Sequence, residues 1–239
     1  AYINHKLSCG LDVNHTEFDL SNNTQTNQRW LIGLYAYCNT SLQDVFLKVE
    51  TAIRDDEITA LYYDLKAPFE VMILLDKNDL NAIEIGRHLS NAINLIDMRS
   101  PYSKSFYKSV TAAREYLQNE FYNKSCHEQL VTVSCVGHTH IDIAWLWTLN
   151  QTREKAIRSF ATVDYLMERY PEYKFLASQP LLYDYVRHDH PELYERIRLK
   201  INEDRWEPEG GMWVESDCNM PSGESLIRQF MFGQNYFQQ

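Results

Sequence analysis

The stretch "LVTVSCVGHTHIDIAWLW", residues 130–147, joins a short apolar run to an alternating series of polar residues. A continuous apolar run of this length is typical of a strand that is buried on both faces of a parallel sheet. His138, His140 and Asp142 follow it at every second position, and two tryptophans come next. The stretch therefore predicts a buried strand over 130–136 whose carboxyl end carries polar side chains.

The rest of the C-terminal half repeats this order of strand and helix. Helices are expected over 152–170, on either side of Pro191 and from Ser222 onward, and short strands over 174–178 and 206–217. Alternation of this kind favours an α/β fold with a parallel sheet. We expect residues 129–239 to be the N-terminal part of an α/β domain.

The N-terminal residues have a different pattern. Residues 1–75 are rich in β-branched and aromatic residues, as in 29–38 and 42–54, with polar turn clusters between them. This predicts an antiparallel β domain, which the strand-like start of the chain suggests is incomplete. We therefore expect the chain to be part of a longer protein.

Residues 76–128 are expected to be a helical linker. Asp79 is a suitable N-cap for a helix, and residues 101–122 begin with Pro101 and continue with helical spacing. Two apolar faces are predicted: Leu80, Ile83, Leu89, Ile93 and Ile96 in the first helix, and Phe106, Val110, Ala113, Tyr116 and Leu117 in the second.

Composition narrows the classes of partner and compartment. The net charge of −10 disfavours a nucleic acid or an anionic membrane as partner. No apolar run approaches the ~20 residues that a membrane span needs. The five cysteines are scattered without a paired spacing, which favours a reducing compartment and hence a cytoplasmic location.

The polar residues at the strand ends are candidate metal ligands. Side chains two apart on an extended segment point to one side, so His140 and Asp142 can face one ion. Asp217 follows the third predicted strand, and the ends of parallel strands gather at one edge of a sheet. Imidazole and carboxylate donors suit Zn²⁺ or a related divalent cation. A hydrogen-bonded histidine without metal, and a loop-capping role for Asp217, fit the spacing as well.

Three motifs in order resemble the class II α-mannosidases, glycoside hydrolase family 38. They are "GHTHIDIAWLW" (137–147), "ASQP" (177–180) and "EPEGGMWVESDCNMPSGESLIRQF" (207–230). The last motif is closest to the cytosolic and bacterial branch. A weaker likeness extends upstream through "GLDVNH" and "YYDLK". The resemblance implies that residues 129–239 contribute the first strands and helices of a (β/α)7-like barrel.

The resemblance also implies roles for individual residues. His140 and Asp142 would be zinc ligands, Asp217 both the catalytic nucleophile and a metal contact, and Trp145 the residue that stacks on the sugar. The implied activity is retaining hydrolysis of terminal α-mannosides on a mannose-containing oligosaccharide. His138 and Arg228 would be supporting residues.

In the family, a fourth ligand histidine and the acid/base aspartate come well after the nucleophile motif. We therefore expect residues 1–239 alone to be inactive. A homo-oligomer is compatible with the resemblance for the full-length protein.

Two other functions fit parts of the pattern. A metal-dependent deacetylase or amidohydrolase on a similar barrel would use such ligands to activate water. A non-enzymatic carbohydrate-binding module would use the β domain over residues 1–75. The role of Asp217 separates the first of these from a mannosidase, because only a nucleophile forms a covalent glycosyl intermediate.

Overall fold

The computed structural model describes residues 1–12, 15–20, 28–36, 48–125 and 132–238. They belong to two compact units. One consists of Ala1–Gln43 together with Val133–Gln239, and the other of Asp44–Thr132. The first residues of the chain therefore fold with the C-terminal half, and not as part of a separate domain over residues 1–75.

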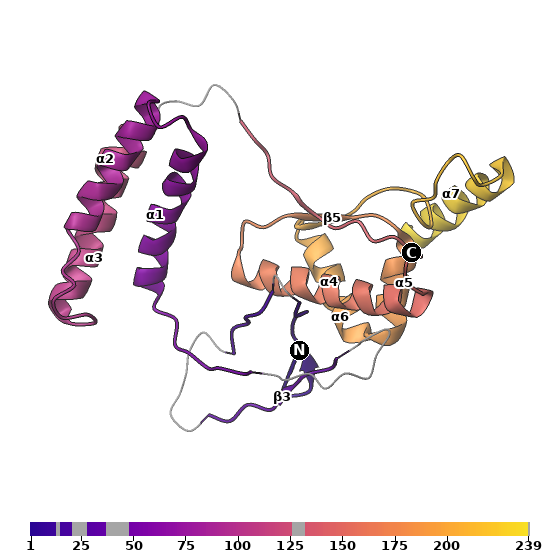
Figure 1. Cartoon of the computed structure of the whole chain (residues 1–239). Coiled ribbons are helices and arrows are strands. Elements are labelled where there is room, and N and C mark those ends of the chain that lie inside the picture. The colour runs from indigo at the N-terminus through magenta and orange to yellow at the C-terminus, as the bar shows by residue number, and fades with distance from the viewer. Residues whose placement is uncertain (13–14, 21–27, 37–47, 126–131, 239) are drawn as a thin grey trace. The chain divides into compact units, whose positions relative to one another are not determined.

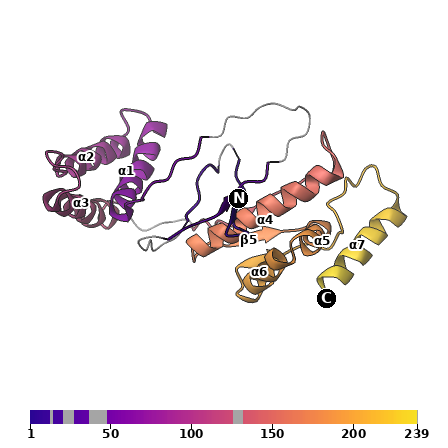
Figure 2. The same ribbon diagram turned by 90° about the horizontal axis from the view of Figure 1, so that it is seen from below.

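The unit Asp44–Thr132 is helical. It contains α1 (Asp56–Leu74), α2 (Leu80–Asn94) and α3 (Lys104–Tyr116), which continues into the π-helical turn η1 (Leu117–Tyr122). The three helices run side by side in both views (Figures 1 and 2). They share a core that includes Leu61, Ile85, Leu89, Val110 and Leu117. The two helices expected in 76–128 are confirmed, with Asp79 as the N-cap of α2.

The prediction of strands through residue 75 is wrong for residues 56–74, which form α1. The Asp55 side chain accepts a hydrogen bond from the Ile58 amide, and Asp56 and Glu57 occupy the first turn. A capping aspartate and acidic residues in the first turn favour a helix start. The composition is misleading because β-branched and aromatic residues of this helix, such as Tyr62 and Val71, are exposed.

The predicted apolar face of α2 is largely wrong. Leu80, Ile83 and Ile93 are exposed, and of the predicted set Leu89 is buried. The buried face instead consists of Ala82, Ile85, His88, Leu89 and Ala92, at spacings of three and four residues. This spacing is the one that places side chains on one face of a helix. In α3 and η1, the predicted Phe106, Val110, Ala113 and Leu117 are buried as expected.

The other unit contains two small sheets. The first is antiparallel, with strands β1 (Tyr2–Ile3), β2 (Lys6–Leu7) and β3 (Ile32–Gly33) in the order β2-β1-β3. Antiparallel pairing near the N-terminus was therefore expected correctly, although the strands are short. Of the strand predicted over 42–54, residues 42–47 lie outside the described residues, and 48–54 form no strand.

The second sheet is parallel, as predicted. Its strands are β4 (Gly137–His138), β5 (Phe175–Ala177) and β6 (Trp206–Pro208), in that order. The helices that alternate with them are α4 (Leu149–Arg169), α5 (Pro180–Asp189), α6 (Pro191–Asn202) and α7 (Gly223–Phe237). Residues 132–136 are exposed and form no strand, contrary to prediction, and 130–131 lie outside the described residues. Gly137 already pairs with Phe175, the first residue of β5, so β5 offers no partner to earlier residues.

An aromatic cluster joins the parallel sheet to its helices. Phe160, Phe175, Tyr183 and Trp206 pack together, with ring centroids of Phe175 and Trp206 4.7 Å apart. Figure 2 shows α4, α5 and α6 beside β5. This core holds β5 and β6 in place and so fixes where the loops after the strands begin.

Among the described residues, no helix is both long enough and apolar enough to cross a membrane.

Candidate active site

Three loops leave the parallel sheet at the same edge. The loop after β4 carries His140 and Asp142, the short connection after β5 carries Ser178 and Gln179, and the segment after β6 leads to Glu215. Because the strands are parallel and adjacent, their carboxyl ends lie together. The third loop does bring a carboxylate to His140, but it is that of Glu215 and not of the predicted Asp217.

His140 and Asp142 face each other. The Nε2 atom of His140 lies 2.8 Å from Oδ1 of Asp142, and both side chains are about half exposed. The alternate spacing in the sequence therefore places both side chains on one side of the loop, as expected.

The other ring nitrogen of His140 is also engaged. Its Nδ1 atom lies 2.6 Å from Oε2 of Glu215. The carboxylate of Asp142, and then that of Glu215, raise the pKa of His140 above its ordinary value of 6.5. The cause is that hydrogen bonds and negative charges beside an imidazole favour its protonated form.

Gln179 joins the two motif loops through its side chain. Its amide nitrogen donates to the carbonyl oxygen of Ile141 at 3.0 Å, and its amide oxygen accepts from the backbone N–H of Glu215 at 3.2 Å. The side chain is buried, and the residue adopts a left-handed conformation with φ of 65°. The loop after β4 is thereby tied to the segment that leads to Asp217.

Asp217 is exposed at the end of this segment. Its Oδ1 accepts a hydrogen bond from the Asn219 amide at 2.8 Å, which is a local turn contact. Within the part of the chain that the structure describes, no hydrogen bond or ion pair joins Asp217 to His140 or Asp142. The structure thus brings together two of the three predicted ligands.

The two tryptophans of the first motif differ in their surroundings. Trp145 is 68% exposed and meets Trp147 edge to face. Trp147 is anchored: its indole N–H donates to Asp142 O and to Thr152 Oγ1, and Lys155 Nζ lies 3.2 Å from its ring centroid. Trp147 therefore supports the loop, while most of Trp145 is exposed.

The two predicted supporting residues have other contacts. His138 is exposed on β4, where it pairs in register with Leu176. Arg228 is on α7 and donates to Glu224 Oε1 at 2.9 and 2.7 Å. Its contact is thus with a neighbour on the same helix and not with the Asp217 carboxylate.

His140 and Asp142 supply two of the donor atoms that a divalent metal site needs. Metal-binding histidines usually give their second ring N–H to a carboxylate, and the Nδ1 contact with Glu215 is of this kind. An imidazole nitrogen and a carboxylate oxygen that point at each other can also share an ion. However, over residues 1–12, 15–20, 28–36, 48–125 and 132–238, no three or more His, Cys, Asp and Glu side chains are grouped to hold a metal.

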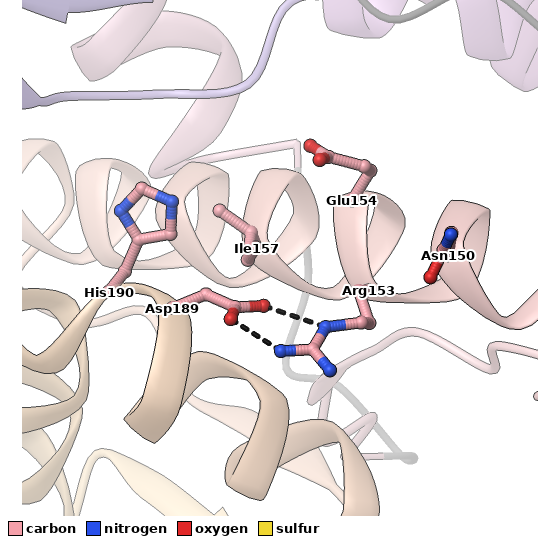
Figure 3. A pocket seen from close by; sticks show the side chains of 6 residues that line it. All are labelled: Asn150, Arg153, Glu154, Ile157, Asp189 and His190. Atoms are coloured by element: carbon pink, nitrogen blue, oxygen red, sulfur yellow. Dashed lines mark hydrogen bonds and ion pairs between the residues drawn. The ribbon is translucent and has the colours of Figure 1, made fainter.

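A separate hollow lies along α4 and α5 (Figure 3). Arg153 makes a two-pronged ion pair with Asp189 there, with nitrogen–oxygen distances of 2.5 and 2.9 Å. The hollow is lined by Asn150, Arg153, Glu154, Ile157, Asp189 and His190. Because none of these is a predicted site residue and its charged pair is already satisfied, we assign it no role.

Sequence reasoning gave no role to Gln179 and did not pair Glu215 with His140. Glu215 stands two residues before Asp217 in the strand predicted over 206–217, where side chains two apart would share a side. That spacing is the one signal in the sequence that could have marked Glu215. The Gln179 contacts depend on the register of β4, β5 and β6 and have no local signal.

Comparison with known proteins agrees with these motifs. Residues 130–239 match the profile "Glycosyl hydrolases family 38 N-terminal domain". The chain is 37% identical over 209 residues to Alpha-mannosidase G of Dictyostelium discoideum, which covers 86% of the chain and 18% of that relative. It is 43% identical over 163 residues to Alpha-mannosidase of Saccharomyces cerevisiae, covering 63% of the chain and 14% of the relative.

Alpha-mannosidase 2C1 of Homo sapiens is 33% identical over 192 residues, which is 80% of the chain and 18% of that protein. The chain thus spans less than a fifth of the length of these relatives. Residues 130–239 of the chain belong to the N-terminal domain of glycosyl hydrolase family 38.

Proposed function

We propose that the natural protein containing this chain is a retaining α-mannosidase that acts on terminal α-mannosides of oligosaccharides. The observation that carries the proposal is the meeting of the His140–Asp142 loop and the Glu215 segment within the family 38 match. Three relatives that carry the name α-mannosidase support it. The catalytic domain would be a (β/α)7-like barrel to which β4, β5 and β6 contribute.

Asp217 is the proposed nucleophile. Its carboxylate is exposed beyond the sheet edge, where a substrate can reach it. Retaining glycosidases use a carboxylate nucleophile and a second carboxyl group about 5 Å away as acid and base. Trp145, with its exposed ring, would stack on the sugar.

His140, Asp142 and Asp217 would hold Zn²⁺ or another divalent cation. Such an ion, when bound, would grip two hydroxyl groups of the mannose ring and favour its distortion. His140 offers Nε2 on the side of Asp142, while Glu215 occupies Nδ1. The chain thus presents one imidazole and one carboxylate to the same point.

The cytoplasm is the proposed compartment. Cys9, Cys135 and Cys218 are free thiols in the part of the chain that the structure describes, which is consistent with reducing surroundings. Cys38 and Cys126 lie outside the described residues.

The proposal is tested on the natural protein with an aryl α-mannoside, before and after treatment with a chelator. We expect hydrolysis that the chelator abolishes and that added Zn²⁺ or another divalent cation restores. The matching aryl α-glucoside is the control substrate and should not be cleaved. Cleavage of other glycosides without mannosides would contradict the substrate, and activity that survives complete metal removal would contradict the metal.

The two other functions have weaker support. A deacetylase or amidohydrolase would not be expected to match a glycosyl hydrolase profile over residues 130–239. A binding module over residues 1–75 would need a separate domain there, whereas the N-terminal residues fold with Val133–Gln239.

A further inference from the structure

We propose that Glu215 is the positioning residue of His140, and that Ser178 and Gln179 hold Glu215 in place for this role. The inference rests on the proposed function in one respect, because it takes His140 to be the residue that offers Nε2 to a metal. The positioning itself is a property of the chain's own hydrogen bonds.

The His140 ring is held from both edges. Nε2 lies 2.8 Å from Asp142 Oδ1, and Nδ1 lies 2.6 Å from Glu215 Oε2. An imidazole that is half exposed has few packing contacts to fix its rotation. Two carboxylates at opposite ring nitrogens set that rotation.

Glu215 is itself fixed by the connection between β5 and α5. The hydroxyl group of Ser178 donates to Oε1 of Glu215, while Oε2 faces His140. The two carboxylate oxygens therefore contact residues from two different loops, and these contacts fix the orientation of the carboxylate. The Glu215 backbone is held as well, through the amide oxygen of Gln179.

Gln179 links the loop of His140 to the backbone of Glu215. It is 2% exposed, and both ends of its side-chain amide are used, by Ile141 and Glu215. A left-handed backbone at a residue other than glycine is uncommon and persists where surrounding contacts determine it. Pro180 follows as the first residue of α5, so the helix start fixes the position of Gln179.

This arrangement connects the loop of His140 to the loop of Asp217. Glu215 lies two residues before Asp217, so whatever holds Glu215 also limits where Asp217 can lie. The link explains the presence of the short "ASQP" motif between the other two motifs, since its serine and glutamine make the contacts.

The first experiment compares crystal structures of the metal-free natural protein and its variants, and reads the rotamer and order of the His140 ring. Glu215→Ala should release the ring, which should occupy more than one rotamer. Glu215→Gln should keep the single rotamer, because an amide oxygen can still accept a hydrogen bond from Nδ1. Glu172→Gln, at an exposed site, is the matched control.

The second experiment measures Zn²⁺ affinity of the natural protein by competition with a chromophoric chelator. Loss of a residue that orients a metal ligand typically lowers metal affinity by ~10–100-fold, so Glu215→Ala should bind Zn²⁺ more weakly by that factor. Glu215→Gln should lose less affinity than Glu215→Ala. Ser178→Ala, a milder change, should weaken binding in the same direction by a smaller factor.

A His140 ring that keeps its single rotamer and its order in Glu215→Ala would overturn the inference. If that variant does not fold, unchanged Zn²⁺ affinity in both Ser178→Ala and Glu215→Gln would overturn it instead. A natural protein that binds no Zn²⁺ or other divalent cation, but whose His140 ring is released in Glu215→Ala, would contradict the metal in the proposed function while supporting the positioning role of Glu215.

Discussion

Trp145 and Trp147 are two positions apart in the sequence motif but have different surroundings. The indole N–H of Trp147 is satisfied by Asp142 and Thr152, whereas Trp145 presents its ring to solvent. An exposed aromatic ring beside polar groups is a common platform for a sugar. The sugar-stacking role that the family resemblance implies for Trp145 is consistent with this difference in burial.

Trp145→Ala should lower kcat/KM of the natural protein for an aryl α-mannoside by roughly tenfold, or about 1.4 kcal/mol of transition-state binding. Its thermal midpoint should stay close to that of the unmodified protein, because little of the side chain is buried. Steady-state kinetics and a thermal melt check both points. Unchanged kinetics, or a loss of activity explained by a lower thermal midpoint, would argue against stacking.

At the level of residues, local spacing predicted more of the site than distant pairing. His140 and Asp142 are two positions apart, so their meeting follows from an extended backbone. Glu215 is far from His140 in sequence, and their contact requires three strands in the correct register. No local pattern contains that information, which is why the partner of His140 was not foreseen.

Among the elements, the junction of β5, β6 and α5 is held by one buried hydroxyl group. Tyr183 donates to the carbonyl oxygen of Ala177 at 2.8 Å and accepts from Trp206 Nε1 at 2.9 Å. Burial raises the pKa of Tyr183 well above its ordinary range. The hydroxyl group thus stays neutral and serves both neighbours.

Tyr183→Phe should destabilise this unit, because it leaves the Trp206 N–H and the Ala177 carbonyl buried without a partner. Such groups cost ~1–3 kcal/mol each when left unpaired, and relaxation will reduce the sum. Urea unfolding measures the change. Tyr170→Phe, which removes the same atom from an exposed ring, is the control and should have little effect. Equal stability of the two variants would contradict the role assigned to the hydroxyl group.

The elements that sequence predicted well are those with strong local signals. The helix pair divided at Pro191 and the helix capped by Ser222 are confirmed. Proline at the first position of a helix and serine at its N-cap favour a helix start through contacts within the first turn, so the local sequence is enough to predict them. The helix over 56–74 was missed because its exposed aromatic and β-branched residues resemble a strand pattern. The strand predicted over 130–136 is absent from 132–136, and β4 begins only at Gly137, because apolar content does not show where the partner strand begins.

At the scale of the whole molecule, the N-terminal residues are bound to the family 38 segment by specific contacts. Arg196 donates from Nε to Asp164 Oδ2 at 2.6 Å and from Nη2 to the carbonyl oxygen of Leu7 at 3.1 Å. The amide of Gly10 donates to Thr162 Oγ1 at 3.1 Å. These contacts explain why the chain's first residues fold with its second half.

Arg196→Ala should destabilise the unit by ~3–5 kcal/mol, because it leaves the buried Asp164 carboxylate without its partner. Arg198→Ala is the matched control: Arg198 is exposed and pairs with Glu195 on the same helix, so its loss should cost at most ~1 kcal/mol. Denaturant unfolding of both variants checks the comparison. Similar stabilities would contradict the stabilising role of the Arg196–Asp164 pair.

The most direct test of the proposed function is covalent trapping of the nucleophile in the natural protein. A 2-deoxy-2-fluoro or 5-fluoro mannosyl fluoride should form a stable glycosyl ester, because the fluorine slows breakdown of the intermediate in a retaining enzyme. Peptide mass spectrometry should find the adduct at Asp217, in the peptide containing "VESDCN", and Asp217→Asn should be both unlabelled and inactive. An adduct on a different carboxylate, or turnover that survives in Asp217→Asn, would contradict the account.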